Sequence, residues 1–141
     1  MKLVLDSGVL SRLCHAAAEQ SKPLFARIQQ LRAAQASVIV YVPDIVDFEV
    51  RRKLIHMRRK PSIDRLDALH GVFTSLKLNT SIMRKAAELW AEARWRGQAT
   101  SGETSLDADV VLAAQALSVG GTVATTNVKH LGQFVDVQDW S

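Results

Sequence analysis

Short apolar runs alternate with longer helical patterns along this chain, and this alternation constrains the fold more than any other feature. Strand-like runs occupy Lys2–Leu5, Ser37–Val42 and Thr122–Thr125, with a weaker one at Leu76–Leu78. The run Ser37–Val42 is nearly all β-branched or aromatic, as in a strand that is buried on both faces. Strands that alternate with helices form parallel sheets. The sequence therefore predicts an α/β fold with a central parallel sheet flanked by helices.

Helical patterns fill the intervals between these runs, and Gly, Pro, Ser, Asp or Asn bounds each of them. We expect helices at Gly8–Glu19, Pro23–Ala34, Ile45–Arg59, Ser62–Phe73, Ser81–Arg96 and Asp107–Val119. The connections are short except for the polar, glycine-bearing stretch Gly97–Ser105. We expect a loop there that can move with substrate.

Composition favours one soluble domain that spans residues 1–141. The chain is 48% hydrophobic, without an uninterrupted apolar span of membrane length. The opening run through Asp6 is too short and too charged at Lys2 for a signal peptide. The single cysteine, Cys14, cannot form an internal disulfide and fits a helix core. These features predict a cytoplasmic protein that has no membrane partner.

Three carboxylates, Asp6, Glu49 and Asp109, stand at borders between apolar segments and turns. Asp6 directly follows the first strand, and ligands of open parallel sheets bind beyond the carboxyl ends of the strands. Asp6 or its neighbour Ser7 can equally cap the following helix. Glu49 borders a basic helix face, so an ion pair with Arg52 or Lys53 is an alternative to a ligand role.

Two acids begin the apolar helix predicted at Asp107–Val119. Residues two apart on a helix face away from each other, so Asp107 and Asp109 can share a ligand only if Asp107 lies at or before the cap. The polar turn after Thr125 adds the hydroxyl of Thr126 and the amide of Asn127, although Asn127 can instead form an Asx turn. Hard oxygen donors of this kind predict Mg²⁺ or Mn²⁺.

The strongest electrostatic feature is a basic block within residues 51–60. The chain carries a formal net charge of +4, which favours an anionic partner. Phosphate contacts that do not read bases suit such a block, but a solvated helix end and a protein partner are alternatives. The candidate phosphate-binding residues are Arg51, Arg52, Arg58, Arg59 and Lys60, and Lys129 near the C-terminal turn.

In order along the chain, four segments resemble the pattern of PIN-domain ribonucleases, in particular the small toxins of the VapC type. The segments are Leu3–Ser7, Asp44–Arg52, Asp109–Ala116 and Ala124–Leu131. The resemblance spans nearly the whole chain. It implies a PIN-like, Rossmann-like fold, divalent-metal-dependent cleavage of RNA, a homodimer and a cognate antitoxin whose tail occupies the site.

Carried over to this sequence, the resemblance implies that Asp6, Glu49 and Asp109 are the catalytic acids. Asn127 stands at a fourth position that the family fills with Asp or Asn, and Asp107 is an additional candidate ligand. The neutral Asn127 leaves one fewer negative charge, which puts tight binding of a second metal ion in doubt. Ser7 and Thr126 would support the site.

Three other functions compete with this interpretation. The chain can be a PIN-like RNA-binding or regulatory module without useful catalysis, or a nuclease that acts on DNA. A receiver-type signalling domain also gathers acids at strand ends, but this sequence lacks an acid that ends a middle strand as a phosphoacceptor. If the protein dimerises, the helices near Leu13 and Trp90 are candidates for the interface.

Overall fold

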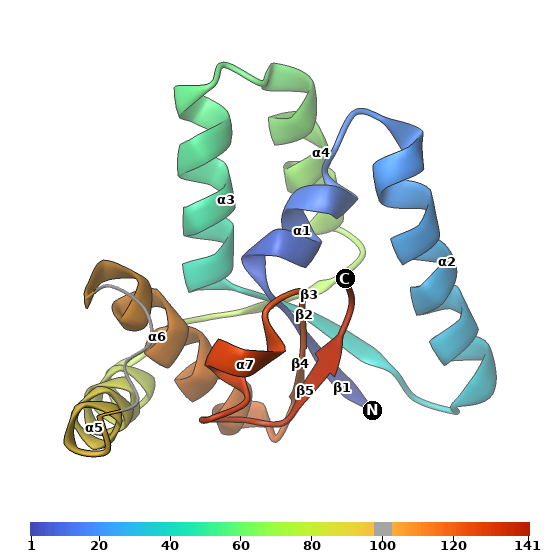
Figure 1. The fold of residues 1–141 in the computed structure, drawn as a ribbon. Coiled ribbons are helices and arrows are strands. Elements are labelled where there is room, and N and C mark those ends of the chain that lie inside the picture. The colour runs from blue at the N-terminus through green and yellow to red at the C-terminus, as the bar shows by residue number, and fades with distance from the viewer. Residues whose placement is uncertain (98–102) are drawn as a thin grey trace.

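The computed structural model describes residues 1–97 and 103–141, which form a sheet surrounded by helices (Figure 1). The strands are β1 (Lys2–Leu5), β2 (Ile39–Pro43), β3 (Thr74–Leu76), β4 (Thr122–Thr125) and β5 (Val137–Asp139). The helices are α1 (Ser7–Leu13), α2 (Ala18–Ala34), α3 (Asp44–His56), α4 (Lys60–Leu69), α5 (Thr80–Trp95), α6 (Glu103–Val119) and α7 (Val128–Leu131).

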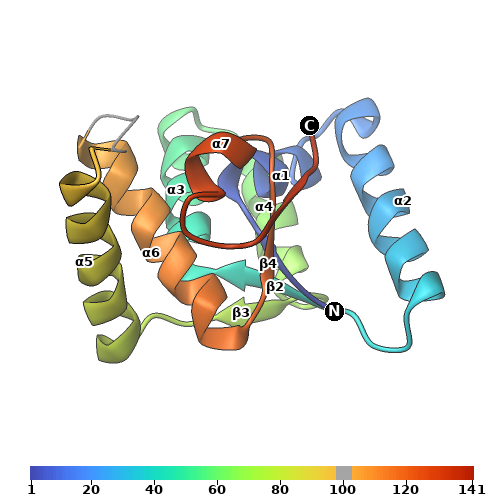
Figure 2. The same ribbon diagram turned by 60° about the horizontal axis from the view of Figure 1, so that its bottom comes forward.

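The sheet is parallel throughout, with the strand order β3-β2-β1-β4-β5. β1 is therefore central, and its partner β4 pairs Leu5 with Ala124. In both views, α2 lies to one side of the sheet and the adjacent helices α5 and α6 lie to the other (Figure 1 and Figure 2). The predicted parallel α/β sheet flanked by helices is confirmed, and the residues that follow β1 and β4 meet at one edge.

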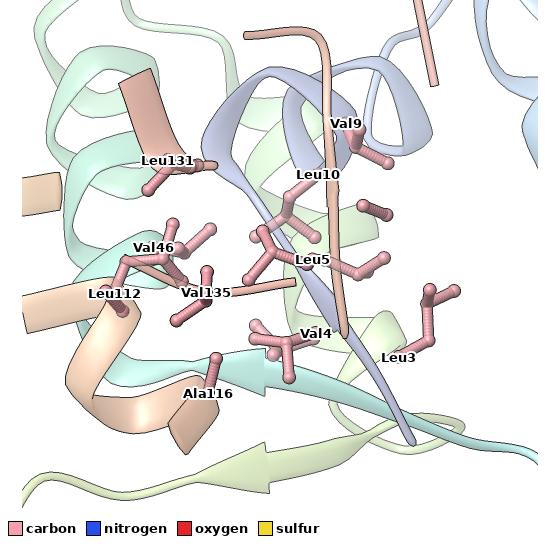
Figure 3. Close-up of a cluster of buried hydrophobic side chains, with 14 of the residues drawn as sticks. Leu3, Val4, Leu5, Val9, Leu10, Val46, Leu112, Ala116, Leu131 and Val135 are labelled. Atoms are coloured by element: carbon pink, nitrogen blue, oxygen red, sulfur yellow. The ribbon is translucent and has the colours of Figure 1, made fainter. Parts of the chain in front are cut away.

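The core forms where β1 packs against the helices around it. Leu3, Val4 and Leu5 are fully buried, as expected for the central strand of a parallel sheet. Figure 3 shows Val4 and Leu5 in one cluster with Val46 of α3 and Leu112 of α6. This packing fixes α3 and α6 on the strand that precedes Asp6, so burial of apolar surface brings the candidate acids into one region.

Several predicted boundaries are wrong. α1 ends at Leu13 rather than continuing to residue 19, and α2 begins at Ala18, before Pro23. Pro23 was expected at the first helical position, but it lies inside the helix, which gives up the bond that its missing N–H would have donated. α3 ends at His56, ahead of Arg58 with its positive φ of 55°.

The later boundaries differ as well. α6 begins at Glu103, so residues 103–105 of the predicted Gly97–Ser105 loop belong to this helix. Residues 98–102 of that loop lie outside the described structure. α4 spans Lys60–Leu69 rather than Ser62–Phe73, and β3 overlaps the predicted run Leu76–Leu78 only at Leu76. The sequence analysis missed α7 and β5, since β5 is three residues long and depends on its ladder with β4. Within the described residues, none of the helices is long and apolar enough to cross a membrane.

Candidate active site

Asp6 follows β1 directly and serves as the N-cap of α1. The backbone N–H of Ser7 donates to Asp6 Oδ1 at 2.7 Å, so the predicted capping role is confirmed. The other carboxylate oxygen, Oδ2, accepts a 2.6 Å hydrogen bond from the hydroxyl of Thr125. The hydroxyl of Ser7 also donates to Oδ1, at 3.4 Å. Both oxygens are thus held in place, and Oδ2, which accepts one bond, retains a lone pair for a cation.

Thr125 is a supporting residue that the sequence analysis missed. It is fully buried at the end of β4, and its hydroxyl oxygen also accepts a 2.9 Å bond from the backbone N–H of Asn127. The expected supporting residue, Thr126, is exposed instead, and its hydroxyl oxygen would lie 2.9 Å from a Cβ added at Gly8. The β1–β4 register, which places Thr125 beside Asp6, is the signal that would have identified it.

Glu49 and Asp109 reach the same region from α3 and α6. Burial is the main cause that raises the pKa of Glu49; the charge of Asp6 raises it further, Arg52 lowers it, and Asp109 also raises it. Burial raises the pKa of Asp109 to about 6, with a further contribution from the charge of Asp6. The three carboxylates therefore repel one another across the site.

Hard oxygen donors and mutual repulsion fit a divalent cation, which would neutralise this charge. The type of the ligand atoms suits such an ion, but the three carboxylates are not arranged as a coordination shell. Among the side chains that the structure describes, no three Asp, Glu, His or Cys residues converge tightly enough to form a ready metal-binding group. Closing the three acids onto an ion would need adjustment of their side chains.

Asp107 does not join the three acids. Because α6 begins at Glu103, Asp107 lies inside the helix rather than at its cap, and its side chain is exposed. Two helical positions separate residues by roughly 200° around the axis, so Asp107 and Asp109 point to different sides. The condition under which these two acids could share a ligand is not met.

Asn127 lies at the edge of the site, next to Thr125. Its side chain does not cap α7, and its Nδ2 lies 2.9 Å from Nδ1 of His130. If that nitrogen accepts the bond, the amide oxygen of Asn127 stays available as a neutral ligand. Lys129, the basic residue of α7, is exposed nearby in the chain.

The predicted phosphate contacts include side chains paired with carboxylates of the protein and side chains that line a groove, and Arg51 belongs to the first group. Its guanidinium binds Asp47 through Nε at 2.8 Å and through Nη2 at 3.1 Å, and Asp67 of α4 through Nη1 at 2.8 Å. His70 contacts the same carboxylate of Asp47 at 2.7 Å. Burial alone would raise the pKa of Asp47, but hydrogen bonds from Arg51 and His70 hold it below its usual value. Arg51 thus joins α3 to α4, and its charge is already balanced by two carboxylates.

Other basic side chains line an open groove of about 1060 Å³ between α1, α3 and the start of α4. Its wall includes Arg52, Lys53 and Arg59, and Glu49 and Ser7 also line it. Arg58 is exposed, and Lys60 forms a 2.6 Å surface ion pair with Asp64. The groove therefore presents cations beside one of the three acids, as a site for a phosphodiester backbone requires.

Comparison with known proteins identifies the family and the fold of this chain. A model of the PIN domain matches residues 3–132, which is most of the chain. Among curated proteins, no sequence matched.

Solved structures share the fold at low sequence identity. The VapBC2 complex of Rickettsia felis bound to promoter DNA has a TM-score of 0.82 and 14% identity, and the match covers 100% of both chains. VapBC-1 of nontypeable Haemophilus influenzae has a TM-score of 0.75 and 20% identity, over 99% of this chain and 98% of that one. FitAcB of Neisseria gonorrhoeae has a TM-score of 0.70 and 20% identity, over 97% and 96%. At such identities the likeness establishes the fold alone.

Proposed function

We propose that this chain, which belongs to the PIN domain family, is a divalent-metal-dependent endoribonuclease. PIN domains are typically nucleases that use divalent metal ions. The observation that carries the proposal is the electrostatic coupling of Asp6, Glu49 and Asp109 beyond the sheet edge.

In this proposal, Asp6, Glu49 and Asp109 hold Mg²⁺ or Mn²⁺, and Asn127 adds a neutral oxygen at the edge. When bound, the metal activates water and stabilises the charge that develops on the phosphate oxygens. Thr125 and the N–H of Ser7 orient the Asp6 carboxylate. Asp107 is left out of this set because of its place inside α6.

RNA would follow the groove between α1 and α3. Arg52, Lys53 and Arg59 would contact the phosphates there, since these side chains line it beside Glu49. The other predicted phosphate-binding residues, Arg58, Lys60 and Lys129, are exposed and would add weaker contacts outside the groove.

We further propose that the protein is the toxin of a toxin–antitoxin pair, held inactive by a cognate antitoxin in the cytoplasm. The structures with the same fold include VapBC complexes, and this supports an antitoxin partner. A homodimer is part of the proposal, but its interface cannot involve Leu13, which is buried, and Trp90 is only partly exposed. Trp95 on α5, 81% exposed, is the better candidate for an interface.

The test is cleavage of matched RNA and DNA oligonucleotides and a mixed RNA pool by purified, partner-free protein, with Mn²⁺, Mg²⁺ or EDTA. We expect RNA cleavage that depends on metal and is lost in Asp6→Asn and Asp109→Asn variants whose folding is verified. Preference for DNA would overturn the RNA assignment. A protein that binds RNA but cleaves no substrate with either metal would be a binding module rather than a nuclease.

Two adjacent arginines provide a matched control for the RNA path. Arg52→Ala should weaken RNA binding and reduce its dependence on salt, because it removes a groove cation. Arg51→Ala should instead destabilise the fold with little effect on RNA affinity, because it breaks the ion pairs to Asp47 and Asp67. Equal losses of RNA affinity in both variants would contradict the proposed path.

A further inference from the structure

Phe48 is an exposed aromatic residue directly before the candidate acid Glu49 on α3. It is 54% exposed, although large apolar side chains on α3 such as Val46 and Val50 are buried. Consecutive helix positions differ by about 100°, so Phe48 lies on the solvent side of the helix beside Glu49. The core packing described above does not account for this residue.

Arg52 connects Phe48 to the groove. Its guanidinium carbon lies 4.9 Å from the centre of the Phe48 ring, within the range of a cation–π contact. Arg52 also lines the groove with Glu49. One turn of α3 thus carries an aromatic ring, a guanidinium plane and a carboxylate side by side.

Aromatic rings and guanidinium planes are the surfaces on which proteins stack unpaired bases. Ile55, which is 58% exposed, extends the apolar stripe of Phe48 one turn beyond Arg52. The charges around this stripe indicate which kind of partner it binds. Groove cations and a chain charge of +4 favour an anionic partner with flat apolar faces.

We propose that Phe48 and Arg52 form a stacking platform for one nucleobase of single-stranded RNA, next to the phosphate cleaved at the three acids. The inference rests on the proposed ribonuclease function and adds to it a contact with the base. Arg52 would serve both the base and the backbone. An unpaired base can offer its face to Phe48, whereas a base inside a duplex has both faces covered by its neighbours.

The test compares the affinity of single-stranded RNA for Phe48→Ala, Phe48→Leu and Phe48→Tyr, each built on Asp109→Asn so that the RNA stays intact. Fluorescence anisotropy in the presence of Mg²⁺ gives the dissociation constants. Phe48→Ala and Phe48→Leu should bind RNA about 5-fold to 20-fold more weakly, which lies in the lower part of the range expected for the loss of one base–aromatic stack. Phe48→Tyr should bind like the parent, because it keeps the ring. Val72→Ala, at another exposed apolar position, is the matched control and should bind like the parent.

A second arm uses RNA oligonucleotides with one abasic position, moved along the strand. Removal of the base that stacks on Phe48 should lower the affinity of the RNA for the parent protein. It should not lower the affinity for Phe48→Ala, because this variant has already lost that contact. Circular dichroism verifies that each variant is folded, which is expected for an exposed position.

The outcomes separate the two proposals. If wild-type protein cleaves RNA and Phe48→Ala or Phe48→Leu binds like the parent, the platform is overturned and the nuclease function stands. If wild-type protein neither binds nor cleaves RNA, the ribonuclease proposal fails and the platform with it. Light scattering tests whether Phe48→Ala changes the oligomeric state. If it does, and the monomeric forms of the parent and of Phe48→Ala bind RNA with equal affinity, the surface is a protein interface and the inference is overturned.

Discussion

At the scale of single residues, the surroundings of Asp109 disfavour its charged form. Burial, with the charge of Asp6, raises its pKa from 3.8 to about 6. Between these values, the folded protein binds more protons than the unfolded chain. Stability contributed by this group therefore falls as pH rises through that window, and at pH 7 the folded state holds an unfavourable, partly buried carboxylate.

Asp109→Asn should raise the melting temperature of the metal-free protein at pH 7.5, because it removes that charge while it abolishes cleavage. The gain should shrink at pH 4.5, where Asp109 is largely protonated in the folded wild type. Thermal unfolding in EDTA at both pH values measures this. Asp136→Asn, at an exposed position, is the control. A gain of the same size at both pH values would mean that Asp109 is not held in a charged cluster.

At the scale of the elements, Gln115 of α6 connects the segments that carry two of the acids. It is fully buried; its Nε2 donates to the carbonyl of Leu76 at 2.7 Å, and its Oε1 accepts from the N–H of Ile45 at 3.4 Å. The same side chain thus ties α6 to the end of β3 and to the first turn of α3. Because Glu49 lies on α3 and Asp109 on α6, Gln115 helps to set the spacing between their helices.

Gln115→Leu should lower the free energy of unfolding by about 1–3 kcal/mol, because a side chain of similar size leaves a buried carbonyl and an N–H without partners. Urea denaturation measures the change. Gln29→Leu on the exposed face of α2 is the matched control and should stay within about 0.5 kcal/mol of wild type. Equal stability of the two variants would show that the bridge between α6, β3 and α3 contributes nothing.

At the scale of the whole molecule, the candidate site exists only in the folded chain. Asp6 follows β1, whereas Glu49 and Asp109 lie on α3 and α6, and these elements are far apart in sequence. An ion that binds all three acids therefore binds the folded state and has no equivalent site in the unfolded chain, so it must stabilise the fold.

Millimolar Mg²⁺ or Mn²⁺ should raise the melting temperature of the wild-type protein by about 5 °C or more if the ion is present at about 100 times its dissociation constant. The ion binds the folded state alone, and it relieves the repulsion among the three acids there. Thermal scans against NaCl of equal ionic strength measure the shift, and Asp109→Asn should lose most of it. An unchanged melting temperature at millimolar concentrations of both metals would count against an assembled metal site.

Local patterns in the sequence were sufficient for most of the architecture. Short apolar runs predicted β1, β2 and β4, and the alternation with helices predicted a parallel sheet. The structure also has Asp6 directly after β1, as the sequence predicted, because the position of an acid after a strand is a local property. Short elements such as β5 escaped detection because their stability comes from pairing with a neighbour.

The sequence by itself determined the parallel α/β fold and the position of Asp6 directly after its first strand, because apolar patterns and chain reversals are properties of neighbouring residues. Only the tertiary structure decided the roles of individual polar side chains. Arg51 and Arg52 are adjacent and identical in type, yet Asp67 of α4 engages the first and the groove leaves the second accessible. Thr125 supports Asp6 from a strand 119 residues away. Such roles depend on distances between elements, and these distances are set by packing of the whole chain.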